Sequence, residues 1–173
     1  MILKNIEIKA KINDYKKVKR LIEDLCLTPI RIEQQKDTFF NTPSGRLKLR
    51  ETKNESAIMY YDRPNSFEPK QSDIALSFTE NPDTLKSVLS KSNGIRGIVK
   101  KKRILYKYEQ TRIHLDNVEG LGGFIELEVV LKENQSAQDG ESIANDLMNK
   151  FSIKTTDLID VAYIDLLETN RQL

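Results

Sequence analysis

A strict alternation of polar and apolar residues, repeated in several short segments, limits how this chain can fold more than any other feature. It is clearest in Arg46-Leu47-Lys48-Leu49-Arg50, where three cations alternate with two leucines. Because successive side chains of a β-strand point to opposite faces, such a segment predicts a strand with one charged and one apolar face. Residues 5–11, 97–109 and 124–131 show the same alternation. A solvated edge strand explains one such segment, whereas paired strands around an enclosed space explain all of them.

The overall charge balance excludes some partners and leaves the local clusters of charge to be explained. Lys and Arg number 28 and Asp and Glu 26, a formal net charge of +2, which predicts binding to neither nucleic acid nor a membrane. The 173 residues suit one domain, 1–173. There is neither an apolar run of membrane-spanning length nor a signal-peptide pattern, so we expect a cytoplasmic protein. The one cysteine, Cys26, excludes an internal disulfide, and we expect it to pack in the core.

The remaining segments predict further strands and the helices that cover the sheet. Strands are expected over residues 34–40, 57–61, 74–79 and 110–118, and amphipathic helices over 15–25, 82–91 and 138–151. Asp157 is expected to cap a last helix that runs through Leu167. The polar stretch 65–73 is expected to form a loop that covers an opening. We therefore expect an α+β fold in which helices cover the apolar face of an antiparallel sheet and charge lines its other face.

Carboxylates on the charged faces of the predicted strands supply oxygen ligands suited to a divalent metal ion. They are Glu7, Asp116, Glu126 and Glu128. Burial and mutual repulsion disfavour the ionised form of carboxylates gathered in one interior, and a divalent cation removes this conflict. Mg²⁺ and Mn²⁺ prefer such ligands, and Mg²⁺ commonly shares itself with the phosphates of a substrate. These residues therefore predict a Mg²⁺ or Mn²⁺ site.

Cations on the same faces are suited to a phosphate chain. They are Lys9, Lys11, Lys48, Arg50, Lys101 and Arg103. Like charges close together on one strand repel each other, so the arrangement costs stability unless an anion lies between them. For residues 46–50 alone, an exposed basic strand is an equally good interpretation. Together with the carboxylates, the cations predict a metal-dependent phosphate site.

Over nearly its whole length the sequence resembles the CYTH superfamily, also called triphosphate tunnel metalloenzymes. Asn5-Ile6-Glu7-Ile8-Lys9 stands where the family has Glu-x-Glu-x-Lys. The other matching motifs are Asp37-Thr38-Phe39-Phe40, Arg46-Leu47-Lys48-Leu49-Arg50, Lys100-Lys101-Lys102-Arg103, and the block from His114-Leu115-Asp116 through Gly120-Leu121-Gly122 to Phe124-Ile125-Glu126-Leu127-Glu128. The last block is the most specific, and it looks closest to the class IV adenylyl cyclase branch.

The resemblance implies a closed eight-stranded antiparallel β-barrel flanked by helices, whose tunnel binds a triphosphate and a divalent metal ion. Glu7, Asp116 and Glu126 resemble the metal ligands, with Glu128 as a supporting carboxylate. The six cations above resemble the phosphate-binding residues, and Lys9 and Arg50 are expected to act in catalysis as well. The expected partner is a nucleoside triphosphate or another organic phosphate, and a homodimer is left open.

Three functions are compatible with this resemblance. The first is conversion of ATP to cyclic AMP and pyrophosphate, in which the ribose 3′-hydroxyl attacks the α-phosphorus. The second is hydrolysis of thiamine triphosphate, tripolyphosphate or a nucleoside triphosphate. The third is binding of an organic phosphate without catalysis.

Two departures from the family pattern keep the non-catalytic hypothesis open. Asn5 replaces the first acidic residue of the signature, and an amide oxygen brings no charge to a metal ion. Asp62 stands where the family often has a lysine, and the adjacent Arg63 is expected to point to the other face of the strand unless a bulge precedes Pro64. For His114, the only histidine, a structural hydrogen-bonded role is favoured over a proton relay with Asp116. Packing is also favoured over base stacking for Tyr60, Tyr61, Tyr106 and Tyr108.

Overall fold

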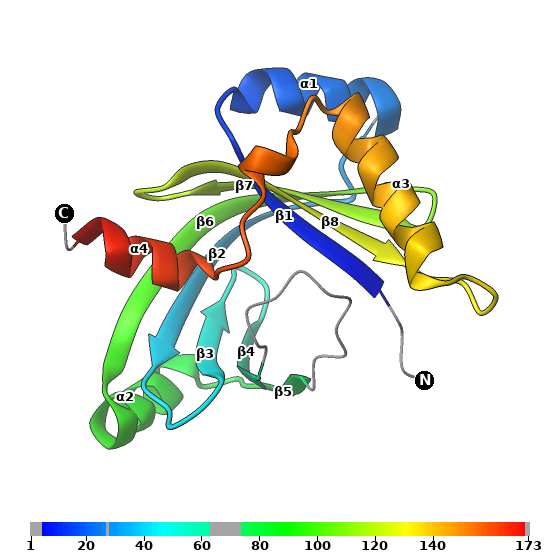
Figure 1. The fold of residues 1–173 in the computed structure, drawn as a ribbon. Coiled ribbons are helices and arrows are strands. Elements are labelled where there is room, and N and C mark those ends of the chain that lie inside the picture. The colour runs from blue at the N-terminus through cyan, green and yellow to red at the C-terminus, as the bar shows by residue number, and fades with distance from the viewer. Residues whose placement is uncertain (1–4, 27, 63–73, 172–173) are drawn as a thin grey trace.

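The computed structural model of the chain describes residues 5–26, 28–62 and 74–171, and one eight-stranded antiparallel sheet organises them (Figure 1). The strands are β1 (Asn5–Ile12), β2 (Arg31–Phe40), β3 (Arg46–Glu51), β4 (Ser56–Tyr61), β5 (Ile74–Phe78), β6 (Ile95–Tyr108), β7 (Thr111–Val118) and β8 (Gly122–Val130). The helices are α1 (Tyr15–Cys26), α2 (Pro82–Asn93), α3 (Ala137–Lys150) and α4 (Tyr163–Arg171), with a 3₁₀ turn, η1, at Thr155–Asp157. The predicted strands and the first three predicted helices are therefore confirmed to within a few residues.

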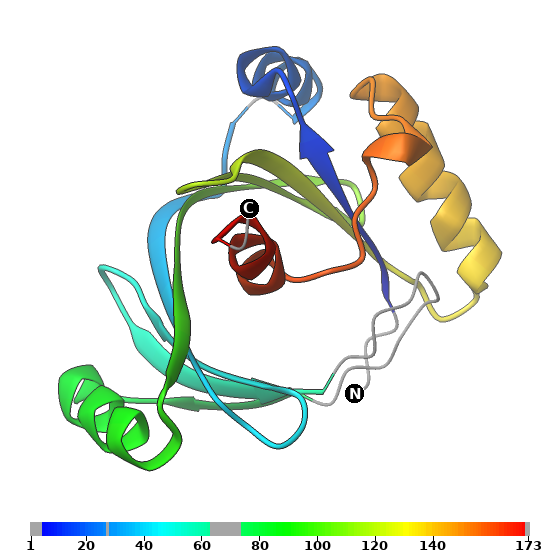
Figure 2. The same ribbon diagram turned by 60° about the vertical axis from the view of Figure 1, so that its left-hand side comes forward.

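The sheet curls strongly but does not close among the described residues. Its strand order is β1-β8-β7-β6-β2-β3-β4-β5, so β1 and β5 are its two edges and form no ladder with each other. Closure needs the outer strands to meet along a shared length, and the curl leaves β1 and β5 apart (Figure 2). The predicted eight antiparallel strands are confirmed, and the predicted closed barrel is corrected to an open, curled sheet.

The two faces of the sheet are divided as the alternation predicts. On the convex face, α1 and α3 pack against β1, β6, β7 and β8 (Figure 1), with Ile22, Tyr106, Leu127 and Leu147 buried in the core between them. On the concave face, α4 lies within the curl of the sheet (Figure 2) and packs on a second, smaller core. Charged side chains gather on the concave face beside this smaller core.

The last predicted helix is wrong in its extent. Asp157 caps only η1, where its Oδ2 accepts a hydrogen bond of 2.9 Å from the backbone N–H of Lys154. The chain then runs extended beside β1, and the N–H of Ile159 donates to the carbonyl of Lys9 at 2.9 Å. Because a helix needs these backbone groups for itself, α4 begins only at Tyr163. This extended segment delivers the start of α4 to the concave face.

Some predictions concern parts of the chain that the structure does not describe. The expected loop at 65–73 and the side chain of Arg63 lie outside the described residues. Cys26 is the last residue of α1, but its side chain is also outside the described part. None of the helices formed by the described residues has the length and apolar character that crossing a membrane requires.

Candidate functional site

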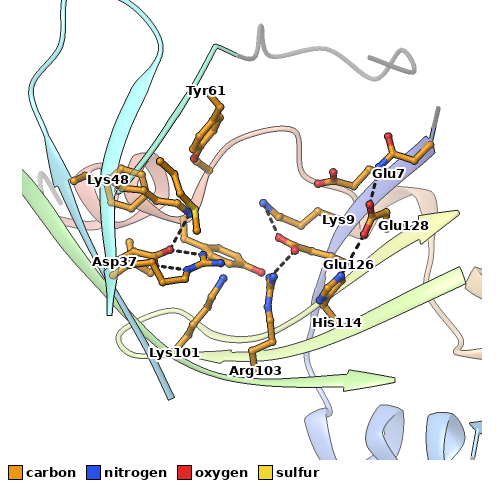
Figure 3. Close-up of a pocket in the computed structure, with 17 residues that line it drawn as sticks. Glu7, Lys9, Asp37, Lys48, Tyr61, Lys101, Arg103, His114, Glu126 and Glu128 are labelled. Carbon is orange, nitrogen blue, oxygen red and sulfur yellow. Dashed lines mark hydrogen bonds and ion pairs between the residues drawn. The ribbon is translucent and has the colours of Figure 1, made fainter. Parts of the chain in front are cut away.

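A cavity of about 330 Å³ opens on the concave face, and side chains from seven strands and from the start of α4 line it (Figure 3). The charged lining residues are the cations Lys9, Lys48, Arg50, Lys101 and Arg103 and the carboxylates Glu7, Asp37, Glu126 and Glu128. Asn5, His114, Tyr61 and Tyr163 also reach it. Residues from the two ends of the chain, Glu7 and Glu126 among them, thus share one cavity with the predicted phosphate-binding cations.

Asp37 is the anion that holds two of these cations together. It is 3% exposed and lies opposite Arg50 in the β2–β3 register. Arg50 donates to both of its oxygens at 2.7 Å, and Lys48 donates to Oδ2 at 3.0 Å. Burial alone raises the pKa of Asp37, but the charges of Lys48 and Arg50 prevail and hold it well below its usual range. The chain itself therefore supplies the anion that the basic strand requires.

Asp116 and Glu126 hold the other arginine. Arg103 donates to the two oxygens of Asp116 at 2.7 and 2.6 Å and to Glu126 Oε2 at 2.6 Å. Asp116 is fully buried and also accepts a hydrogen bond of 2.9 Å from the hydroxyl of Tyr163. It lies behind Arg103 and is not one of the lining residues. Of the four carboxylates predicted to bind metal, Asp116 is thus the one that does not line the cavity.

The carboxylates of β8 form a row beside β1. In the β1–β8 register Glu7 lies opposite Glu128, and Lys9 lies opposite Glu126. Lys9 Nζ is 3.0 Å from Glu126 Oε1. Although burial raises the pKa of Glu126, the charges of Lys9 and Arg103 hold it well below its usual range. Glu126 therefore remains an anion between two cations.

Glu128 is held by neighbours on both sides. Asn5 Nδ2 donates to its Oε1 at 2.8 Å, and His114 Nε2 is 3.7 Å from its Oε2. The nearby His114 side chain lowers the pKa of Glu128 to about 2, with Asn5 and Arg112 acting in the same direction against burial. Glu128 is accordingly ionised at neutral pH. The hydrogen-bonded role of His114 stays a prediction.

Two lysines are buried where their charge is costly. Burial, together with repulsion from neighbouring arginines, lowers the pKa of Lys48 to about 8 and that of Lys101 to about 7. Asp37 and Asp116, respectively, oppose this effect. An anionic ligand placed beside these lysines raises their pKa by the same physical rule. The cavity therefore holds cationic groups that are incompletely compensated before a ligand binds.

Two residues of interest lie apart from the cavity. Lys11 Nζ donates to the carbonyl of Leu121 at 3.2 Å and lies 5.6 Å from the centroid of the Phe124 ring. Neither Lys11 nor Asp62 is among the lining residues, and both are exposed. Five of the six predicted phosphate-binding cations are thus brought together, and Lys11 is placed elsewhere.

Asp37, Tyr163 and Tyr61 line the cavity although the sequence did not single them out as site residues. A signal for Asp37 was available, because the short turn at residues 41–45 pairs its strand with the one that carries Lys48 and Arg50. No local pattern indicates Tyr163, since its position depends on where the extended segment before α4 runs. Packing was expected for Tyr61, and only the curl of the sheet turns it toward the cavity.

The donor set fits a divalent metal ion in part. Among the described residues, no three His, Cys, Asp or Glu side chains are gathered closely enough to form a metal cluster. Mg²⁺, however, is often held by one or two carboxylates together with waters and substrate phosphates. Glu7 and Glu128, which face each other across β1 and β8, have the right chemistry for that arrangement. A preformed cage of four carboxylates is not present in the described part of the chain.

The described residues define an α+β protein in which the concave face of a curled antiparallel sheet gathers lysines, arginines and glutamates around one cavity. Comparison with known proteins makes this specific, because residues 3–163 match the CYTH domain family. The chain therefore belongs to the CYTH family, and the resemblance noted in the sequence is confirmed.

Individual relatives extend this match over nearly the whole chain. A protein of Methanocaldococcus jannaschii, named "Putative adenylate cyclase", is 23% identical over 171 residues, which cover 93% of this chain and 97% of the relative. A solved structure of a Pyrococcus horikoshii protein is 26% identical, with a TM-score of 0.82 over 94% of this chain and 98% of the other. A Hippeastrum protein described as a "Putative adenylyl cyclase" with a dominant triphosphatase activity shares the fold, with a TM-score of 0.68, 15% identity and coverage of 97% and 96%.

Proposed function

We propose that this protein is a divalent-metal-dependent enzyme that acts on the triphosphate of a nucleotide, converting ATP to cyclic AMP and pyrophosphate. One observation carries the proposal: Lys9, Lys48, Arg50, Lys101 and Arg103 line the same cavity as Glu7, Glu126 and Glu128. The cations are suited to phosphate oxygens, and the glutamates are suited to a metal ion. The name of the Methanocaldococcus relative supports the choice of cyclisation.

The charge of the cavity supports a need for metal. Five cationic residues and four carboxylates line the cavity, an excess of one positive charge. Because the pKa of Lys101 is lowered to about 7, this lysine is only partly protonated at neutral pH, which reduces the excess further. A triphosphate brings several negative charges, so the chain alone leaves most of them uncompensated. Glu7 and Glu128 would hold Mg²⁺ or Mn²⁺, and a bound ion would supply positive charge that offsets the charge of the phosphate chain.

The residues of the chain divide the remaining work between two sides of the cavity. Lys48 and Arg50, oriented by Asp37, bind oxygens of the phosphate chain from one side, and Lys9, Lys101 and Arg103 bind it from the other. In the cyclisation, the 3′-hydroxyl gives up its proton to solvent and its oxygen forms a bond to the α-phosphorus, while the bond from that phosphorus to the pyrophosphate oxygen breaks. Fixed cations around the leaving pyrophosphate stabilise the charge that develops on it, and they require no reorganisation during the reaction.

The second candidate is a triphosphatase, in which water attacks the terminal phosphorus. The bond from that phosphorus to the bridging oxygen breaks, so the diphosphate leaves and orthophosphate is the other product. This candidate is favoured by the Hippeastrum protein of the same fold, which is described as having a dominant triphosphatase activity. The cavity side chains serve the same purpose in both reactions, because both need a neutralised phosphate chain. The two candidates differ in the nucleophile and in the phosphorus that it reaches.

Product analysis tests the proposal. The purified full chain is incubated with ATP, thiamine triphosphate or tripolyphosphate, with Mg²⁺, Mn²⁺ or EDTA, and the products are followed by ³¹P NMR and chromatography. Cyclic AMP with pyrophosphate supports the cyclase, and orthophosphate supports the triphosphatase. Lys101→Met should abolish turnover, whereas Lys100→Met, the neighbouring exposed lysine on the other face, should not. Binding of triphosphate without any product would leave only the non-catalytic function.

A further inference from the structure

Tyr163, the first residue of α4, lies close to two lysines that come from distant strands. Its ring centroid is 4.5 Å from Lys9 Nζ and 5.0 Å from Lys101 Nζ. Lys9 is on β1 and Lys101 on β6, and two other strands separate these in the sheet. The side chain of Tyr163 is only 6% exposed, so both contacts are made away from bulk water.

An aromatic ring attracts an ammonium group without adding a full negative charge. This matters at a phosphate site, because a carboxylate that positions a lysine also competes with phosphate for its charge. Lys101 Nζ lies 3.4 Å from Asp116 Oδ2, and Asp116 already accepts from Arg103 and Tyr163. The ring thus orients Lys101 while leaving much of its charge for an anion.

The hydroxyl of Tyr163 fixes the plane of the ring. It donates a buried hydrogen bond of 2.9 Å to Asp116, and Phe124 packs against the ring with the centroids 4.9 Å apart. Donation to a carboxylate also increases the electron density of the ring, which strengthens its attraction for ammonium groups.

From this geometry we propose that Tyr163 is a positioning residue whose ring aligns Lys9 and Lys101 for the phosphate chain, so that α4 is part of the phosphate site. The inference rests on the proposed function only in taking these lysines as phosphate-binding groups. The alternative is that Tyr163 merely fills the small core that it shares with Phe39, Val99 and Ile164. In that case any apolar side chain of similar size serves equally well.

Binding of inorganic tripolyphosphate in EDTA, followed by calorimetry, separates these two roles because it tests the cations without metal or catalysis. Tyr163→Leu should weaken binding about tenfold, the scale of a desolvated contact between an ammonium group and a ring. Tyr163→Phe keeps the ring and should lose less than about threefold. Tyr108→Leu is the matched control, because it removes a ring that lies 5.4 Å from Lys150 outside the cavity, and it should bind as the wild type does.

A second measurement needs neither a variant of Tyr163 nor a ligand. In the wild-type protein the ring current of Tyr163 should move the side-chain Hε signals of Lys9 and Lys101 upfield of the other lysine signals in a ¹³C-resolved NMR spectrum. Lys9→Met and Lys101→Met identify the two signals by removing them. This readout also stands if the wild type binds no tripolyphosphate in EDTA. Absence of binding in Mg²⁺ as well would instead remove the proposed function.

Each result decides the matter in one direction. Upfield lysine signals, with binding kept in Tyr163→Phe and weakened in Tyr163→Leu, support the inference. Lysine signals at ordinary positions overturn it. Equal affinity of Tyr163→Leu and wild type overturns it too, and equal losses in the Phe and Leu variants would assign the effect to the hydroxyl rather than to the ring.

Discussion

Asn5 and Glu128 are joined by a hydrogen bond of 2.8 Å, in which the side-chain amide of Asn5 donates to Oε1 of the carboxylate. Asn5 stands at the first acidic position of the family signature. A hydrogen-bond donor, its amide nitrogen, is therefore present where the family has a negatively charged oxygen. Glu7 already lies opposite Glu128 across β1 and β8. A third carboxylate here adds repulsion when no metal is bound, and Asn5 relieves it.

Asn5→Asp should therefore make stability depend on metal. In EDTA we expect the free energy of unfolding to fall by about 1–2 kcal/mol, because a hydrogen bond is replaced by a like-charge contact. With Mn²⁺ the deficit should shrink or reverse, since the added carboxylate can bind the ion and binding to the native state stabilises it. Urea unfolding with and without Mn²⁺ measures both quantities. Asn117→Asp, an exposed change on β7, should show neither effect, and an Asn5→Asp protein as stable as wild type in EDTA would contradict the account.

Among substitutions in the cavity that keep the shape of the side chain, Asp37→Asn should be one of the most destabilising. It keeps the shape of the side chain but leaves the charges of Lys48 and Arg50 without their shared anion. Breaking a buried ion pair by removing one partner costs about 3–5 kcal/mol, which urea unfolding can measure. Saturating tripolyphosphate should recover part of this loss, because its oxygens can bind the two cations in place of Asp37. Glu119→Gln removes an exposed partner of Lys100 and should cost less than about 1 kcal/mol.

Period-two alternation predicts which side chains share a face, and this was enough to collect most of the site. Lys48 with Arg50 and Glu126 with Glu128 are two apart in sequence and line the cavity together. Alternation does not indicate how deeply a side chain is buried, however. Asp116 lies on the predicted face of its strand, but it is opposite Arg103 in the β6–β7 register. It pairs with Arg103 and is completely buried.

The parts of the fold that sequence reasoning missed depend on contacts between distant segments. Closure of the sheet depends on curl accumulated over all eight strands, which no single strand encodes. The start of α4 depends on hydrogen bonds between the segment before it and β1, so local helix signals near Asp157 were misleading. Tyr163 was missed for the same reason.

Proton uptake should accompany binding of phosphate at mildly alkaline pH. Burial lowers the pKa of Lys101 to about 7 and that of Lys48 to about 8, from 10.5 in the unfolded chain. Between the lowered pKa of each lysine and 10.5, the unfolded chain binds more protons than the folded chain. These two groups therefore make the free energy of unfolding rise with pH over that range. An anion favours the protonated lysines, so the affinity for tripolyphosphate should fall as pH rises from about 7 to 9.

Calorimetry at pH 8 in buffers of different ionisation enthalpy measures this uptake. Lys101→Met should reduce the number of protons taken up, whereas Lys100→Met, the exposed neighbour, should leave it as in the wild type. Proton release on binding, or affinity that does not change with pH, would contradict the lowered pKa values.

Asp165 should be the residue through which α4 keeps its place on the sheet. Its Oδ2 accepts from Arg46 of β3 at 2.8 Å, and its Oδ1 accepts from Arg96 of β6 at 2.7 Å. Asp165→Asn weakens both ion pairs, and we expect the free energy of unfolding to fall by about 2 kcal/mol and the amides of α4 to exchange faster with solvent. Because Tyr163 begins this helix, affinity for tripolyphosphate should fall as well.

Glu168→Gln is the matched control for Asp165→Asn. Glu168 also receives hydrogen bonds from Arg96, at 2.9 and 2.7 Å, but its side chain is 36% exposed and it lies one helical turn further from Tyr163. A more exposed ion pair contributes about 0–1 kcal/mol, so this variant should unfold and bind tripolyphosphate almost as the wild type does. If the two variants lost equal affinity, the anchoring of α4 would depend on Arg96 alone, and the bond from Arg46 to Asp165 would have no part in positioning Tyr163.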